Sequence, residues 1–256
     1  MKSPIHLKAN RSNCSHALKK LIPRGTVVHS FLFLTGEVEC VLLQDNRFVV
    51  AHTNKYAVYE FWRCLMEDPN RVAEVVDFFS PLKESRIFHI LQDNWTAYKD
   101  PFVRSGLFFL LNYHSSTGLI SSGEFQEGGL APLAIANLRN FAAENFHIQF
   151  DEEDDFLKDA ATVGNEECLL IAAGNYHLNF LEKGTSIGLE ETRVYHKQLQ
   201  NFFNKTDKKC VLVYKNHRQL FNVYKNHNII MVDQYGRPSQ KKEKCAEVLI
   251  ANFRID

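Results

Sequence analysis

The stretch Cys168-Leu169-Leu170-Ile171-Ala172-Ala173, followed by Gly174-Asn175-Tyr176, decides the fold of this chain. Six consecutive apolar residues that end at a glycine are typical of a strand buried on both faces of a parallel sheet. Further strands are expected at 26–33, 47–51, 209–214, 228–233 and 246–253, and helices at 55–80, 132–141 and near 190–203. Strands that alternate with helices favour a mostly parallel α/β sheet, with an antiparallel finish where the last strands follow each other closely.

The composition bounds the size of the domain and the kind of partner. The chain has 256 residues, 45% of them hydrophobic, which is enough for one domain or one domain with an insertion. Thirty basic and thirty acidic side chains cancel, so binding to a polyanion would require a local patch. Residues 1–24 carry six basic side chains and no acid, and residues 205–245 carry ten against three acids. Both stretches are equally consistent with a solvated surface.

The cysteines and histidines give no sign of a metal site. Six cysteines are scattered without a C-x-x-C pair, several of them within apolar runs, which is the pattern of buried free thiols in a reducing compartment. A zinc site needs clustered ligands, which this spacing does not supply. The sequence contains neither an apolar run of membrane-spanning length nor a signal-peptide core. We therefore expect a cytoplasmic protein without a metal or a membrane partner.

Four segments, in order, resemble the Dam-type DNA adenine methyltransferases. They are 54–77, the run 107–114 with Gly118-Leu119 and Gly123-Glu124-Phe125, the strand and loop around Tyr176, and 247–253. The resemblance implies a Rossmann-like methyltransferase sheet, mostly parallel with an antiparallel C-terminal strand, plus a small helical and hairpin insertion. It divides the chain into an N-terminal part of the fold at 1–82, an insertion similar to the DNA-recognition subdomain at 83–130, and a C-terminal part at 131–256.

Members of that family bind S-adenosylmethionine, flip an adenine out of the duplex and methylate its N6 nitrogen. Phe31 matches the family's pattern, Gly36 is a lone glycine beyond it, and Asp155 with Phe156 matches a pair that contacts adenine. The other cofactor positions that the resemblance implies do not suit the task. Arg11 and Phe33 stand where glycines would let the backbone approach the cofactor, and His52 replaces the acid that would hold the ribose. We therefore expect no bound cofactor.

The catalytic motif that the resemblance implies is also degenerate. In the family the central strand ends in Asp-Pro-Pro-Tyr, whose acid and backbone carbonyl accept the two hydrogens of the adenine amine while the tyrosine stacks on the flipped base. The matching positions here are Ala173, Gly174, Asn175 and Tyr176. An alanine side chain accepts no hydrogen bond, so no catalytic residue is expected.

The DNA-reading hairpin between Gly118 and Gly123 is short and has no basic residue. Sequence-specific readout of the family kind is therefore not expected, because it needs side chains that reach base edges. Phosphate contacts do not need such a hairpin. The residues expected to contact DNA are Lys8, Arg11, Lys99, Arg104, Asn112, Thr117, Ser121, Lys215, Arg218 and Arg237.

Three interpretations follow from these patterns. The first is a catalytically degenerate methyltransferase homologue, a pseudoenzyme that binds double-stranded DNA in an architectural or regulatory role. The second is a pseudoenzyme that binds a protein partner or itself, without DNA. The third is a divergent but active methyltransferase, which would need S-adenosylmethionine.

Overall fold

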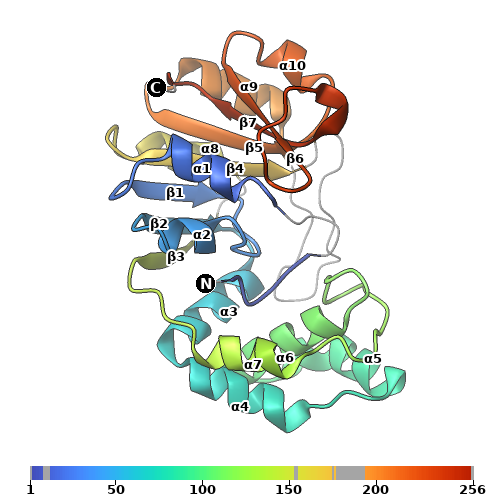
Figure 1. Ribbon diagram of the computed structural model, residues 1–256. Coiled ribbons are helices and arrows are strands. Elements are labelled where there is room, and N and C mark those ends of the chain that lie inside the picture. The colour runs from blue at the N-terminus through green and yellow to red at the C-terminus, as the bar shows by residue number, and fades with distance from the viewer. Residues whose placement is uncertain (1, 8–11, 153–154, 175, 177–193, 255–256) are drawn as a thin grey trace.

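The seven strands form one sheet in the order β3-β2-β1-β4-β5-β7-β6 (Figure 1). In a computed structural model of the chain, the residues described are 2–7, 12–152, 155–174, 176 and 194–254. The strands are β1 (Val27–Phe31), β2 (Phe48–Thr53), β3 (Phe146–Phe150), β4 (Cys168–Gly174), β5 (Lys209–Lys215), β6 (Asn228–Asp233) and β7 (Cys245–Ala251). The first five are parallel, and β7 lies antiparallel between β5 and β6.

This arrangement confirms the expected fold class, a Rossmann-like methyltransferase sheet with an antiparallel C-terminal strand. β4 lies at the centre because residues 168–171 are buried on both faces, as their unbroken apolar run predicts. The other predicted strands are also present, each within two residues of its expected bounds. β3 was not predicted.

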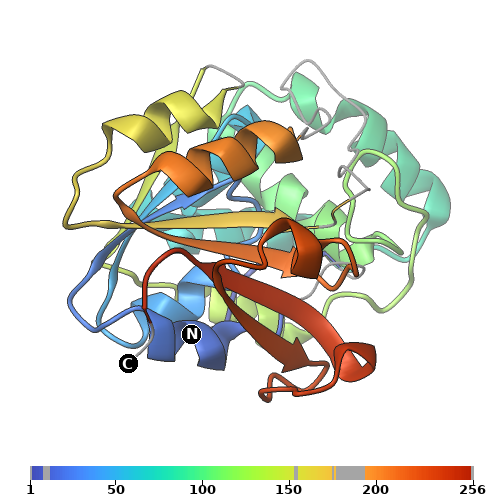
Figure 2. The same cartoon turned by 90° about the horizontal axis from the view of Figure 1, so that it is seen from above.

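Helices cover both faces of the sheet. α1 (Ser15–Leu21) and α2 (Glu39–Leu43) lie on one face, and α8 (Phe156–Thr162) and α9 (His196–Lys205) lie on the other (Figure 2). The short α10 (Leu220–Val223) follows β5. Two single turns of 3-10 helix are η1 (Trp95–Ala97), which follows α5, and η2 (Lys242–Lys244), which precedes β7. The two faces bury two separate apolar clusters, so β4 contributes to both.

Between β2 and β3 the chain leaves the sheet to build a helical layer, seen below the sheet in Figure 1. It consists of α3 (Tyr56–Glu67), α4 (Pro69–Phe79), α5 (Ser85–Asn94), α6 (Pro101–His114) and α7 (Pro132–Arg139). Asp68 caps α4 through the Arg71 N–H, and Pro69 occupies its first turn, which ends α3 where the sequence predicts a break. The predicted insertion at 83–130 falls within this layer.

The last three residues of β6, 231–233, are covered on their outer edge by the chain that follows them. After a turn, residues 237–239 run back along β6: Val232 bridges Pro238, and the Ser239 N–H donates to the Met231 carbonyl at 2.8 Å. The Asp233 N–H donates to the Arg237 carbonyl at 2.8 Å. We call residues 237–239 the edge clip.

Candidate functional site

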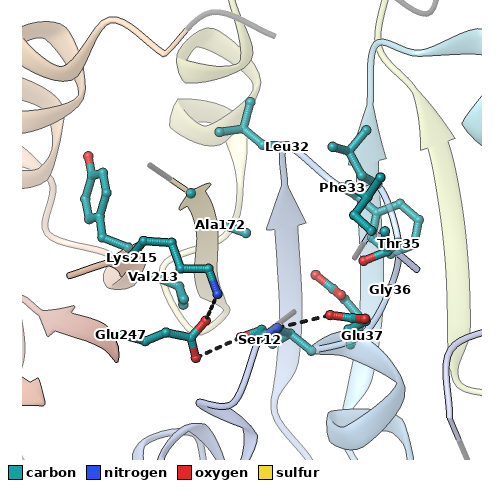
Figure 3. Close-up of a pocket in the computed structure, with 16 residues that line it drawn as sticks. Ser12, Leu32, Phe33, Thr35, Gly36, Glu37, Ala172, Val213, Lys215 and Glu247 are labelled. Atoms are coloured by element: carbon teal, nitrogen blue, oxygen red, sulfur yellow. Dashed lines mark hydrogen bonds and ion pairs between the residues drawn. The ribbon is translucent and has the colours of Figure 1, made fainter. Parts of the chain in front are cut away.

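A small cavity lies at the carboxyl ends of β1, β4 and β5, the edge at which open α/β sheets bind ligands (Figure 3). Its volume is about 90 Å³, and its wall combines apolar side chains such as Leu32 and Val213 with the charged side chains of Glu37, Lys215 and Glu247. Pockets that hold drug-sized ligands measure about 300–1,000 Å³. The cavity therefore suits a few water molecules or a small polar group.

Glu247 organises the charged side of this cavity. It lies on β7 with 1% of its surface exposed. One carboxylate oxygen accepts from the Lys215 ammonium at 2.7 Å, and the other accepts from the Asn13 N–H at 2.6 Å and the Ser12 hydroxyl at 3.3 Å. The Ser12 N–H in turn donates to Glu37 at 3.0 Å. These bonds, three of which are drawn in Figure 3, hold residues 12–13 against the cavity.

The loop after β1 has an unusual backbone at the cavity wall. Leu32 has a φ of 62°, a left-handed conformation that leucine adopts only at a cost of about 1–2 kcal/mol. Gly36 has a φ of 70°, and a Cβ there would lie 2.7 Å from the Trp62 ring. The Phe33 ring packs at 5.3 Å from Trp62 and 5.8 Å from Phe146. Phe33 and Gly36 thus serve the packing between this loop and the helical layer.

A buried carboxyl group lies at the start of α2, in the wall of the same cavity. Glu39 is 4% exposed, and its carboxyl accepts a hydrogen bond from the Ser30 hydroxyl at 2.5 Å. Burial raises the pKa of Glu39, because the charged form loses its hydration, and the Ser30 bond only partly offsets this effect. Glu39 therefore holds a proton to higher pH than an exposed glutamate.

His52, which the resemblance aligns with a ribose-binding acid, belongs to a row of four ionisable side chains across the sheet. Its Nδ1 lies 3.3 Å from the Asp151 carboxylate, and its Nε2 lies 2.9 Å from Nδ1 of His29. The Nε2 of His29 lies 3.3 Å from Glu167. Phe31 stacks on His52 with ring centroids 4.2 Å apart. The contacts of His52 near the end of β2 are thus with side chains of its own chain: Phe31, His29 and Asp151.

The three contacts among these four side chains need three hydrogens, whereas two neutral imidazoles carry only two N–H hydrogens. Burial lowers the pKa of His29, and the positive charge that His52 can carry lowers it further, against the opposing effect of Glu167. His29 is therefore less readily protonated in the folded state than in the unfolded chain. Since the unfolded chain then binds more protons, stability rises with pH through the range between the folded pKa and about 6.5.

We expect protonation of His29 to account for part of the fall in stability at lower pH. The Tm of the unmodified protein should fall by about 3 °C more than that of His29→Asn between pH 7.5 and pH 5.5, because the variant keeps an amide near the Nδ1 position but cannot be protonated. Thermal unfolding followed by circular dichroism measures this difference. His16→Asn, on the exposed face of α1, is the matched control and should retain the full pH dependence. Equal slopes for the protein and His29→Asn would contradict the assignment.

The carboxyl end of β4 offers no acidic side chain. Ala172 and Gly174 line the cavity, whereas Ala173 packs into the apolar cluster under α8 and α9. Asn175 lies outside the described residues. The Tyr176 ring packs against His217 at 5.3 Å and His196 at 4.7 Å, so its contacts are with histidines of its own chain. Asp155 is exposed and precedes α8.

Three of the residues expected to contact DNA are held by internal bonds. The Arg104 guanidinium pairs with Glu60 and donates to the carbonyls of Tyr98 and Lys99. The Asn112 side chain is 4% exposed and bonds the backbone of His6 and Gly118. Lys215 pairs with Glu247. A phosphate contact at any of these three would require existing bonds to break.

The other residues expected to contact DNA lie nearer the surface. Lys99, Thr117, Arg218 and Arg237 are exposed, and Ser121 is half-buried. Lys99, Thr117 and Ser121 lie in the helical layer and its loops, whereas Arg218 and Arg237 lie at the opposite end of the sheet, near α10 and β6. Lys8 and Arg11 lie outside the described residues. The structure therefore does not bring these side chains together on one face.

Sequence reasoning missed Glu37, Glu39, Glu247 and the pair His29 and Glu167. A single acid within an otherwise apolar strand, as in Glu247-Val248-Leu249-Ile250, is the one signal that could have identified a buried charge. Within the described ranges, no three His, Cys, Asp or Glu side chains are grouped so as to hold a metal ion. None of the described helices has the length and apolarity needed to cross a membrane.

Comparisons with known proteins place few further constraints on this site. No family model matches the sequence, and no curated protein matches it. Among solved structures, a crystal structure of a fibrillarin/Nop5p complex is similar over 94% of this chain and 79% of that chain, at 11% identity and a TM-score of 0.32. A similarity of this degree supports no statement about activity, ligand or partner.

Proposed function

We propose that this protein is a homologue of the DNA adenine methyltransferases that has lost methyl transfer and binds double-stranded DNA through its phosphate backbone. One observation carries the claim that methyl transfer is lost. Where β4 meets the cavity, the residues that line it are Ala172 and Gly174, and Ala173 packs in the core. An adenine amine needs hydrogen-bond acceptors to become nucleophilic, and these residues supply no side-chain acceptor.

The cavity supports the same proposal. Its volume of about 90 Å³ is small for a nucleoside cofactor. Glu247 and Glu37 hold residues 12–13 beside it, and Leu32 takes a left-handed conformation in its wall. Opening the cavity would break the bonds to a carboxylate that is almost fully buried. We therefore propose that no S-adenosylmethionine binds there.

Calorimetric titration with S-adenosylmethionine tests this part of the proposal. We expect no saturable heat at cofactor concentrations up to about 1 mM, which corresponds to a binding free energy weaker than about −4 kcal/mol. An active methyltransferase titrated under the same conditions is the positive control. Saturable binding would contradict the proposal and favour a divergent active enzyme, which transfer of a radiolabelled methyl group to adenine-containing duplex DNA would then reveal.

A second candidate function, binding of a protein partner or of a second copy, is favoured by one observation. Phe78 on α4 is 83% exposed. It lines a mostly apolar groove together with Val75, Phe79, Tyr98 and Val103. Exposed apolar patches of this kind are common at protein interfaces. Light scattering after size-exclusion chromatography distinguishes a dimer from a monomer by molar mass. A monomer at all concentrations would argue against self-association.

A further inference from the structure

We infer that the DNA contact surface lies at the β6 end of the sheet rather than in the helical layer, an inference that rests on the proposed function. The surface consists of five exposed cations in the loop after β5 and in the β6–β7 connection. We call it the basic hairpin surface, and its members are Arg218, Arg237, Lys241, Lys242 and Lys244.

The described part of the chain does not neutralise the charges of this surface. Among the residues that the structure describes, no carboxylate forms an ion pair with any of the five cations. Residues 216–244 contain two acids, Asp233 and Glu243. One oxygen of Asp233 accepts from the N–H groups of Tyr235 and Arg237, at 2.8 and 2.9 Å, within its own turn. A protein of zero net charge thus carries a local positive field at this edge.

The helical layer has the opposite character. Three of its five arginines form ion pairs within the layer: Arg71 with Asp100 at 2.6 Å, Arg104 with Glu60, and Arg139 with Asp77. Residues 83–130, which resemble a DNA-recognition subdomain, contain four basic and five acidic side chains. Because phosphate binding requires cations that can release the counterions of DNA, this layer is the weaker candidate of the two.

The basic hairpin surface is built on a fixed frame. The Asn216 amide donates to the carbonyls of Lys242 and Cys245, at 3.0 and 2.9 Å, which joins the loop after β5 to the β6–β7 connection. Lys242 lies 4.5 Å from the centre of the Phe221 ring. The edge clip holds Arg237 beside β6. Because the backbone that carries these cations is already ordered, binding does not also have to order the loops, which favours affinity.

An aromatic side chain extends from the same turn. Tyr235 is 73% exposed, and the Arg237 guanidinium lies 5.8 Å from the centre of its ring. Phosphate contacts give affinity without sequence preference, and a tyrosine hydroxyl is one of the groups that hydrogen-bond phosphate and sugar oxygens. We therefore infer that the surface holds duplex DNA independently of sequence, with most of the affinity dependent on salt.

The test compares two variants of equal charge. Lys241→Gln/Lys242→Gln/Lys244→Gln removes three cations of the surface, and Lys20→Gln/Lys83→Gln/Arg86→Gln removes three exposed cations elsewhere. Fluorescence anisotropy with a labelled 20-base-pair duplex of arbitrary sequence gives the affinity of each between about 50 and 200 mM salt. Thermal unfolding verifies that both variants are folded.

We expect the first variant to bind about tenfold or more weakly, and the slope of log affinity against log salt to fall by about 2–3, since each lost phosphate contact removes about 0.9. The second variant should keep most of the slope of the unmodified protein. Equal losses in both variants, or a larger loss in the second, would overturn the inference while leaving DNA binding intact. No salt-sensitive binding by the unmodified protein would overturn the proposed function and this inference together.

Discussion

Replacement of Glu247 by alanine is expected to lower the free energy of unfolding by about 3–5 kcal/mol, the usual effect of removing one partner of a buried ion pair. Glu247 is 1% exposed and accepts from Lys215, Asn13 and Ser12. Without its carboxylate, the Lys215 ammonium has no counter-charge there, and the half-buried Asn13 N–H loses its acceptor. Denaturant unfolding followed by tryptophan fluorescence measures the change.

Two further variants separate charge from hydrogen bonding at Glu247. Glu247→Gln keeps one acceptor oxygen but places an amide NH₂ against a donor, so its loss should be smaller than that of alanine but still clear. Glu247→Leu/Lys215→Met removes both charges and should recover much of the stability, because a buried ion pair is often replaceable by apolar side chains. If Glu247→Ala unfolded at the same denaturant concentration as the unmodified protein, the anchoring role of Glu247 would be wrong.

Replacement of Arg104 by alanine is the second change with a large expected effect, about 3 kcal/mol of lost stability. The Arg104 guanidinium joins α6 to Glu60 of α3 and to two carbonyls before α6. Glu60 is 5% exposed, so loss of Arg104 leaves a nearly buried carboxylate without its partner. The Glu60 contact also raises the pKa of Arg104, so the guanidinium stays charged. The Tm should fall by about 6–12 °C.

Arg104→Ala also distinguishes a structural role from a DNA contact. At a temperature well below its Tm, the variant should bind the duplex with the same salt slope as the unmodified protein, because Arg104 already has its partners within the chain. Arg104→Lys is the control: it keeps the charge but not the two-pronged pairing with Glu60, so it should lose part of the stability. An unchanged Tm together with a reduced salt slope would show that Arg104 contacts phosphate instead.

The fold was largely predictable because the central strands are buried on both faces and leave an unbroken apolar signal, as at residues 168–173. β3 escaped prediction for the converse reason. It lies at the sheet edge, its Phe146-His147-Ile148-Gln149-Phe150 alternates buried and exposed side chains, and the run is short. The long α6 also carries little amphipathic signal, since ten of its fourteen residues are buried.

The site was less predictable, because its charged residues come from distant parts of the chain. The bond between Glu247 and Asn13 joins residues 234 apart, and it exists because β7 is inserted between β5 and β6. Similarly, His29 and His52 meet because β1 and β2 are parallel neighbours. No spacing in the sequence encodes either encounter. The lack of an acid at Ala173 and Gly174 could be read directly, since it concerns which side chains are present rather than where they lie.

The edge clip has a consequence for how the protein behaves at high concentration. β6 contains Ile229-Ile230-Met231-Val232, an apolar run with strong β propensity at an open edge of the sheet, and such runs nucleate fibrils when they pair between molecules. Pro238 cannot donate a ladder hydrogen bond, and the lysines of the β6–β7 connection repel a second copy. The cations proposed to bind DNA are therefore also gatekeepers against aggregation. Solubility and nucleic-acid binding would then constrain the same few side chains.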